Sequence, residues 1–291
     1  MTGISIVVAT YNNRKTLEKT LGSLLAQKFY GKFEVIVVND GSTDGTAQFL
    51  ESYKKGKKNL TVIHQENLGV CRARNMGIAA AKFRIVINMD HDCIAHKHWL
   101  LQMARGFDGP LVGVVSAYDY YGGTSTGFRK ELLEKVSGYD EEYRYYREDT
   151  DLSFKIMDLG YKFRLVKAGY AHDHTQAKPR GLFSLARHVI QRLYYHQNDV
   201  LLYKKHPTKV CEKFLHIKFG FIVDPMQDFR VATGLWKEGG RMELSSPRGI
   251  TFLENKTPMH TLAIIIIGIG YVIAVKTSRL IGSLRFGKLL V

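Results

Sequence analysis

The 291-residue sequence has few cysteines and lacks a signal-peptide pattern. Cys71, Cys93 and Cys211 are odd in number and lie outside spacings such as Cys-x-x-Cys, which argues against a disulfide framework and for a reducing compartment. The first apolar run, Ile4–Ala9, lacks the features of a signal peptide, which are a basic start, a long apolar stretch and a cleavage site of small residues. We therefore expect most of the chain to stay in the cytosol.

Acidic residues are scarce relative to basic ones. The chain has 42 Lys and Arg against 27 Asp and Glu, a formal charge of +15, which suits an anionic partner such as a nucleotide, a nucleic acid or an acidic membrane. Apolar residues make up 45% and aromatic residues 11% of the sequence. That composition is ample for one large domain or two, each with a core of its own.

The first ninety or so residues alternate between strand and helix patterns. Short β-rich runs predict strands at Ile4–Ala9, Phe33–Val38, Leu60–His64 and Arg84–Met89. Helical spacing of apolar residues predicts helices at Thr16–Gln27, Thr46–Tyr53 and Val70–Ala81. This alternation indicates an α/β fold with a mostly parallel sheet covered by helices on both faces.

The remainder is less regular. We expect a strand at Leu111–Ala117, a glycine-rich loop over Gly122–Gly127, a helix at Glu148–Leu159 and a strand at Phe163–Val166. One or two helices should follow over Phe183–Lys205. The predicted organisation is a catalytic domain over residues 1–178, a helical accessory or acceptor region over 179–258, and a membrane-associating helix with a basic tail over 259–291.

Asp90 and Asp92 follow directly after a predicted buried strand. Ligands bind such sheets beyond the carboxyl ends of the strands, and two carboxylates at this place can converge on Mg²⁺ or Mn²⁺ and bridge it to phosphates. The alternative is a solvated acidic turn, because such triplets are frequent by chance.

Two further polar segments are predicted at the same edge. Asp40 can accept from a base or ribose donor beside Gly41, or this segment is an Asp-Gly turn that caps a helix. Asn67 and Arg74 lie at the start of a helix, where amides and a guanidinium favour phosphate. Arg74 is otherwise a surface charge.

Acidic and histidine side chains complete the candidates. Glu148 and Asp149 fall in the first turn of a predicted helix, where one can be a general base or both can simply suit the helix dipole. His172 and His174 form a His-x-His pair that offers a metal ligand or has a structural role.

Taken in order, these segments resemble the family 2 glycosyltransferases with a GT-A fold, over about the first 175 residues. The motifs that carry the resemblance are Ser5–Asn12, Val38–Ser42, Asn67–Gly69, Ala73–Asn75, Asp90–Asp92, Gly138–Asp140 and Glu148–Leu152. The resemblance departs from the family pattern at Asn39, where many relatives carry an acid, and at His91, where small or acidic residues are common.

The resemblance implies a metal-dependent, hexosyltransferase-like enzyme of glycan or polysaccharide synthesis that inverts the anomeric carbon of a nucleoside-diphosphate sugar. It assigns Thr10, Tyr11 and Asp40 to the nucleoside and Arg74 to the diphosphate. It assigns Asp92, with Asp90, to Mn²⁺ or Mg²⁺. Asp149 becomes the base, while Glu148 orients the acceptor, caps the helix or is itself the base. The donor sugar, the acceptor and the oligomeric state stay open.

The apolar run Thr261–Val275 carries no charge and has 15 residues, fewer than the roughly 20 that cross a bilayer. We expect a monotopic or re-entrant helix on the cytoplasmic face of the membrane, with a buried core helix as the alternative. The basic residues expected on anionic head groups are Lys276, Arg279, Arg285 and Lys288. A membrane location favours a polyprenyl-linked acceptor, approached by the stretch Arg180–Lys205.

Three other functions compete with transfer. A nucleotidyltransferase that makes sugar nucleotides should carry a glycine-rich basic segment near the first strand, which Ala9–Asn13 lacks. For nucleic-acid binding the sequence has no recognisable motif of basic residues, and a carboxylate-lined site repels phosphate unless a metal is bound. An inactive relative that acts as a membrane scaffold would not need the complete set of acids.

Overall fold

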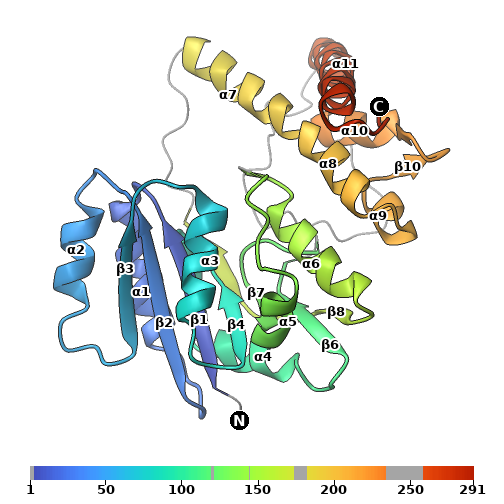
Figure 1. Cartoon of the computed structure of the whole chain (residues 1–291). Helices are drawn as coiled ribbons and strands as arrows, with labels where there is room; N and C mark the ends of the chain where they lie inside the picture. The colour runs from blue at the N-terminus through green and yellow to red at the C-terminus, as the bar shows by residue number, and fades with distance from the viewer. Residues whose placement is uncertain (1–2, 119–120, 144, 174–181, 234–257) are drawn as a thin grey trace. The chain divides into compact units, whose positions relative to one another are not determined.

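The computed structural model describes residues 3–118, 121–143, 145–173, 182–233 and 258–291. The chain forms two compact units, Met1–Gln176 and Ala177–Val291 (Figure 1).

A seven-stranded sheet forms the centre of the N-terminal unit, in the order β3-β2-β1-β4-β7-β6-β8. Four neighbours run parallel, namely β3 (Leu60–Gln65), β2 (Phe33–Asp40), β1 (Ile4–Thr10) and β4 (Ile85–Asn88). β7 (Thr126–Arg129) is antiparallel to both β4 and β6 (Val112–Ser116), and β8 (Lys162–Leu165) is parallel to β6. The predicted mostly parallel α/β sheet is confirmed.

Six helices pack around this sheet in the part of the unit that the structure describes. They are α1 (Arg14–Leu25), α2 (Thr46–Tyr53), α3 (Val70–Ala80), α4 (Trp99–Arg105), α5 (Lys130–Lys135) and α6 (Glu148–Asp158). A separate antiparallel pair joins β5 (Cys93–Ala95) to β9 (Tyr170–His172).

The central strands are apolar on both faces because helices cover both. On one face, Ile6 and Val8 of β1 belong to the same buried cluster as Leu17 and Leu21 of α1, and each fully buried leucine contributes roughly 2 kcal/mol. On the other face α3 approaches so closely that a Cβ on Gly77 would lie 2.4 Å from a methyl group of Val7. These contacts fix α3, and with it the side chains that α3 directs to the site.

The predicted glycine-rich loop is wrong at its end, because Thr126 and Gly127 belong to β7. This strand fills the space between β4 and β6, and its Phe128 is fully buried. Its four residues contain a glycine and no run of β-branched side chains, so the usual sequence signal of a strand is missing.

The C-terminal unit is mainly helical. It contains α7 (Leu182–Tyr195), α8 (Gln197–Lys205), α9 (Lys209–Phe214), α10 (Pro225–Thr233) and α11 (Pro258–Phe286), with a short pair of strands, β10 (Ile217–Lys218) and β11 (Ile222–Val223). The predicted helical stretch 183–205 is therefore two helices, which meet at His196. The last helix has 29 residues and is longer than the predicted apolar run.

Arg279 holds α11 against two other helices of this unit. Its guanidinium is buried and donates to Asp228 of α10 at 2.6 and 3.0 Å and to Asp199 of α8 at 3.1 Å. The prediction that Arg279 contacts lipid head groups is wrong, because a guanidinium held by two buried carboxylates faces the interior. The Ser278 hydroxyl adds a hydrogen bond to the Leu193 carbonyl.

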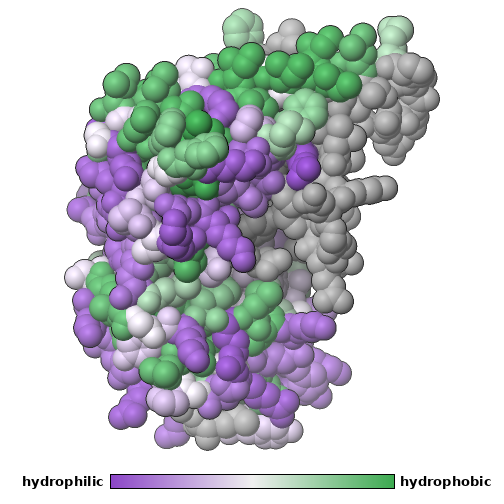
Figure 2. All heavy atoms as spheres, turned by 90° about the vertical axis from the view of Figure 1, so that its right-hand side faces the viewer, coloured by the Kyte–Doolittle hydropathy of each residue, from purple (hydrophilic) through white to green (hydrophobic). Residues whose placement is uncertain are grey.

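Apolar side chains remain exposed on the same unit (Figure 2). On α7 these are Phe183, Val189, Ile190 and Tyr194, and on α11 they are Met259, Leu262, Ile266, Ile267, Ile269, Ile273, Leu280, Ile281 and Leu284. Scattered apolar residues on a surface are ordinary, but a contiguous apolar face marks a site of contact.

Removing one partner of the Arg279 cluster tests its role. We expect Asp228→Ala to destabilise the C-terminal unit by about 3 kcal/mol, because a buried guanidinium loses its two-bond partner. Hydrogen exchange of the α8 and α11 amides measures this loss. The control is Lys209→Ala, which breaks an exposed ion pair with Glu212 and should cost less than about 1 kcal/mol. Equal protection in the two variants would contradict the assignment.

Candidate active site

The loops that follow β1, β2 and β4 meet at the carboxyl edge of the sheet, as the sequence predicts. The Asn12 backbone amide donates to the Ser42 hydroxyl at 2.9 Å, and the Thr43 amide donates back to the Asn12 side chain at 2.7 Å. The His91 ring lies 3.2 Å from the Thr10 hydroxyl. Side chains from three parts of the sequence thus share one region.

Asp40 is buried at this edge and organises the loop that leads into α3. Its carboxylate accepts from the Gln65 side chain at 2.6 Å and from the backbone amides of Leu68 and Gly69 at 2.9 and 3.0 Å. Asn67, which lies in that loop, is exposed, and so is Tyr11 at the end of β1. The structure therefore gives Asp40 a clear structural role beside its predicted role in nucleoside binding.

Arg74 of α3 is buried between three carboxylates. Its Nη1 donates to Glu148 at 3.2 Å and to Asp149 at 3.1 Å, and its Nη2 donates to Asp90 at 3.1 Å. Sequence reasoning predicted that Arg74 faces the diphosphate, and it did not foresee this network. The guanidinium joins the segment after β4 to the first turn of α6.

Tyr139 packs its ring against the Arg74 guanidinium, with 5.2 Å between the ring centroid and Cζ, and supports the same cluster. Its hydroxyl donates to Asp149 Oδ1 at 2.9 Å and accepts from the Asn88 side chain at 2.8 Å. The Asn75 side chain fixes the Tyr139 backbone by bonding its amide and its carbonyl, at 2.8 and 2.9 Å. Asn88 and the Tyr139 hydroxyl therefore position Asp149 through consecutive hydrogen bonds, and Asn75 holds the Tyr139 backbone.

Backbone geometry also places the two acids of α6. Tyr146 and Arg147 both have positive φ, at 72° and 78°, a conformation that costs non-glycine residues energy and recurs at functional sites. Glu148 and Asp149 then occupy the first turn of the helix, where its dipole favours negative charge. Gly122, with φ of 146°, packs so closely that a Cβ there would lie 2.6 Å from the Asp149 carbonyl oxygen.

The shared guanidinium cannot neutralise all three acids. Burial, followed by the charge of Asp149, raises the pKa of Glu148 to about 7. Burial and the charge of Asp90 raise the pKa of Asp149, although Arg74 acts in the opposite direction. Desolvation and mutual repulsion of carboxylates are the two physical causes. The cluster therefore carries excess negative charge when its acids ionise.

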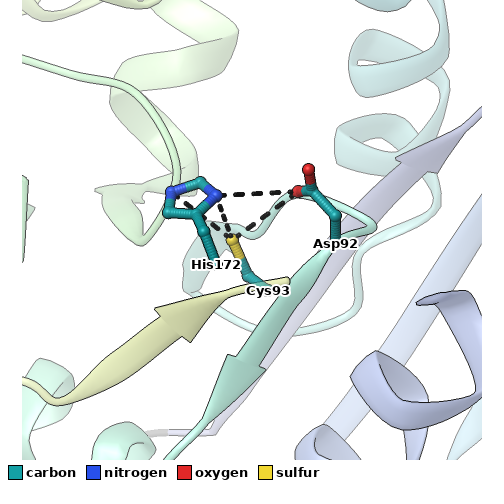
Figure 3. A group of neighbouring side chains, drawn as sticks. All are labelled: Asp92, Cys93 and His172. Carbon is teal, nitrogen blue, oxygen red and sulfur yellow. Dashed lines mark hydrogen bonds and ion pairs between the residues drawn. The ribbon is translucent and has the colours of Figure 1, made fainter. Parts of the chain in front are cut away.

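A second group of side chains lies at the β5–β9 pair (Figure 3). One oxygen of Asp92 lies 3.8 Å from His172 Nδ1 and 3.8 Å from the Cys93 sulfur, which is 3.3 Å from the same nitrogen. The three ligand atoms all lie within 4.8 Å of one another, close enough for one metal ion. Two of these residues were predicted as metal ligands.

Of the remaining predicted ligands, only Asp90 can be located. Asp90 pairs with Arg74 and is not part of the group formed by Asp92 and His172. His174 lies outside the described residues. Cys93 was not predicted to take part, because a single cysteine without a paired spacing gives no metal signal in a sequence. Its position directly after Asp92 was the available hint.

Known proteins match this chain over part of its length. The family model of glycosyl transferase family 2 matches residues 5–174. Poly-beta-1,6-N-acetyl-D-glucosamine synthase of Staphylococcus aureus (strain COL) is 37% identical over 115 residues, which are 39% of this chain and 28% of that protein. Chondroitin synthase of Pasteurella multocida (strain Pm70) is 23% identical over 236 residues, covering 58% of this chain and 24% of that protein. The chain thus spans about a quarter of the length of these relatives.

Solved structures share the fold of this chain. The mannosyltransferase PcManGT of Pyrobaculum calidifontis, in complex with GDP-Man and Mn²⁺, has a TM-score of 0.64 at 20% identity, covering 95% of this chain and 86% of its own. S. aureus TarS 1–349, in complex with UDP, has a TM-score of 0.51 at 20% identity, covering 98% and 92%. These likenesses confirm the predicted GT-A fold. Because the family model matches more than half of the 291 residues, the chain belongs to glycosyl transferase family 2.

Proposed function

We propose that this glycosyltransferase moves a sugar, with inversion, from a nucleoside-diphosphate sugar to an acceptor hydroxyl. The observation that carries the proposal is the Arg74 network, which joins Asp90 on the predicted donor side to Asp149 on the predicted acceptor side. Support also comes from fold neighbours in complex with GDP-Man and with UDP. Inversion needs a base on one side of the sugar and a stabilised leaving group on the other.

The metal-ligating side chains at the β5–β9 pair fit a divalent cation. Asp92 offers a carboxylate oxygen and His172 a ring nitrogen at 3.8 Å from it, and both groups are established ligands of Mn²⁺ and related ions. A bound Mn²⁺ or Mg²⁺ would neutralise charge on the departing nucleoside diphosphate. Asp90 is held through one oxygen by Arg74 and is about a third exposed, so its other oxygen can serve the ribose or the metal.

Asp149 is the better placed of the two candidate bases. Among the described residues, the Tyr139 and Arg74 donors both reach its Oδ1, and none reaches Oδ2. One carboxylate oxygen is thus anchored while the other can accept the proton of an acceptor hydroxyl. The Asp149 side chain is 16% exposed and that of Glu148 only 6%.

Glu148 is the other candidate, since a pKa of about 7 suits a base at neutral pH. Access decides against it, because a base must lie within hydrogen-bond distance of the proton that it takes. We therefore assign Glu148 to holding Arg74 and Asp149 in place, a positioning role that keeps the base on the acceptor side.

The nucleotide would lie at the carboxyl edge of the sheet. Tyr11 and Asn67 lie exposed in loops and can contact the base and ribose, Thr10 is buried at the end of β1 beside them, and Asp40 holds the loop before α3 in shape. Arg74 would act on the diphosphate indirectly, by fixing Asp90. A nucleotidyltransferase or an inactive scaffold would not need a carboxylate placed as Asp149 is, with one oxygen anchored and the other open.

We also propose that the enzyme works at the cytoplasmic face of a membrane on a lipid-linked, polyprenyl-type glycan acceptor. Among the described residues, α11 contains one segment, Ile265–Phe286, that is long and apolar enough to cross a bilayer. The buried contacts of Ser278, Arg279 and Ser283 argue that its second half packs on the protein instead. The exposed apolar faces of α7 and α11 then suit a helix that lies on the membrane.

Replacement of the proposed base gives the first test. We expect Asp149→Asn to lower the transfer rate by at least about 100-fold, because the amide cannot accept the proton, while nucleotide affinity stays within about twofold. Glu148→Gln is the matched control and should lower the rate by less than about 10-fold. Initial rates and nucleotide binding would be measured on the same preparations, with the donor sugar selected by thermal stabilisation. An inactive Glu148→Gln variant together with an active Asp149→Asn variant would contradict this assignment and would make Glu148 the base.

The pH dependence of stability tests the burial of Glu148. Its pKa of about 7 exceeds its ordinary value of 4.5, so the folded state keeps a proton that the unfolded state loses. The stability that this group contributes is therefore lost as pH rises from 4.5 to about 7. We expect Glu148→Gln to flatten this slope and to gain at most about 3 kcal/mol over the parent above pH 7.

Urea unfolding followed by the fluorescence of the buried Trp99 measures this effect. Glu134→Gln is the control, because Glu134 is exposed and its removal should leave the slope unchanged. An unchanged slope in Glu148→Gln would show that Glu148 ionises normally.

Membrane association is tested on the exposed face of α11. Ile266→Lys combined with Ile273→Lys should weaken binding to anionic liposomes by about 10-fold or more, because each change removes an apolar side chain from the membrane. The two side chains are 60% and 62% exposed, so the fold should persist. Leu165→Lys, at a site 53% exposed on the N-terminal unit, is the control. Equal sedimentation of all three proteins with liposomes would rule out this face.

A further inference from the structure

Cys93 lies beside the two residues that fit the catalytic cation. It pairs directly with His172 across the β5–β9 ladder and follows Asp92 in the chain. Figure 3 shows the three side chains pointing toward one another. No part of the proposed transfer reaction requires a thiol at this place.

The distances fit one metal ion bound by all three. A tetrahedral site with metal–ligand bonds of about 2.0–2.3 Å separates its ligand atoms by about 3.3–3.8 Å. Here the sulfur lies 3.3 Å from His172 Nδ1 and 3.8 Å from the Asp92 oxygen, and that oxygen lies 3.8 Å from the nitrogen. Shifts of a few tenths of an ångström would complete the geometry.

The surroundings of Cys93 favour a fixed ligand. The residue is fully buried, and the paired strands hold its backbone opposite that of His172. The Thr124 hydroxyl lies 3.4 Å from the sulfur and can donate to a thiolate, an outer contact of the kind that orients metal ligands. Thr124 also accepts from the Asp90 amide.

We propose that Asp92, Cys93 and His172 form a three-ligand site that binds a thiophilic divalent cation, Zn²⁺ in particular, through the Cys93 thiolate. On binding, the S–H bond breaks, a sulfur–metal bond forms and the proton passes to solvent. The lone pair of His172 Nδ1 and one oxygen of Asp92 complete the protein ligands. The fourth position stays open for an oxygen of the diphosphate, as in three-ligand zinc sites.

The thiolate sets the order of metal preference. Oxygen ligands suit Mg²⁺ and Mn²⁺, whereas thiolate ligands favour Zn²⁺, which also stands above Mn²⁺ in the general order of affinity. This inference rests on the proposed function, because Asp92 and His172 also serve the catalytic ion. Zn²⁺ therefore displaces Mn²⁺ from the site.

Co²⁺, a spectroscopic substitute for Zn²⁺, tests the sulfur ligand. The full chain, freed of metal with a chelator, should bind one Co²⁺ and develop a near-ultraviolet charge-transfer band from sulfur to cobalt. Cys93→Ser should lack that band and bind Zn²⁺ at least about 10-fold more weakly. Cys71→Ser and Cys211→Ser are matched controls at two other buried cysteines and should keep the band. A band of full strength in Cys93→Ser, or its absence from the parent with Co²⁺ bound, would overturn the proposal.

Zinc X-ray absorption of the parent chain needs no variant and stands even where Cys93→Ser fails to fold. We expect one sulfur neighbour at about 2.3 Å, and a shell of nitrogen and oxygen alone would refute the site.

Nucleotide binding separates this inference from the proposed function. Suppose that the bound metal has no sulfur neighbour, while Asp92→Ala abolishes the Mn²⁺-dependent nucleotide binding of the parent. Only the proposal that Cys93 is a metal ligand would then be refuted. If instead Zn²⁺ binding depends on Cys93 but nucleotide binding is the same with and without Mn²⁺, only the proposed role of the metal in transfer would be refuted.

Discussion

One buried guanidinium holds the candidate active site together. Arg74 reaches Asp90 beyond β4 and both acids at the start of α6, so two segments distant in sequence are joined to α3 by a single side chain. A buried charge is tolerated only when it is paired and hydrogen-bonded, and Arg74 meets that condition three times. The same hydrogen bonds hold the three carboxylates close together despite their mutual repulsion.

The charge balance of this cluster explains the division of labour that we propose. Three acids share one cation, and burial together with repulsion from a neighbouring carboxylate raises the pKa values of Glu148 and Asp149. The residual negative charge suits the cation site that we propose. Its proposed ligands are Asp92, directly before β5, and His172 of β9. Tyr139 binds one oxygen of Asp149, and the other is the one that we propose for the acceptor.

Sequence patterns predicted the parts of the fold that follow a regular period. The β-rich runs gave β1 to β4, and leucine spacing gave α1, because helices on both faces require continuous apolar strands. β7 escaped prediction because its four residues include a glycine and gain their strand character from neighbours on both sides. The bounds of α11 were also missed, because its buried Ser278 and Arg279 read as polar surface until their partners on other helices are known.

The candidate site was predictable as a set of residues and not as a geometry. Motif order selected Asp90, Asp92, Arg74 and Asp149, but pairing across the fold decided which of them touch. No sequence period could show that Arg74 faces acids, or that Cys93 lies opposite His172. Such contacts arise from strand pairing and helix packing between segments up to about eighty residues apart.

The most direct measurement of the central claim is the identity of the products. The full chain would be incubated with a panel of nucleotide sugars and Mn²⁺, and the released nucleotide and phosphate species would be separated and identified. The proposed function predicts slow, metal-dependent release of a nucleoside diphosphate, accelerated by the correct acceptor. Release of pyrophosphate would contradict it and would identify a nucleotidyltransferase instead.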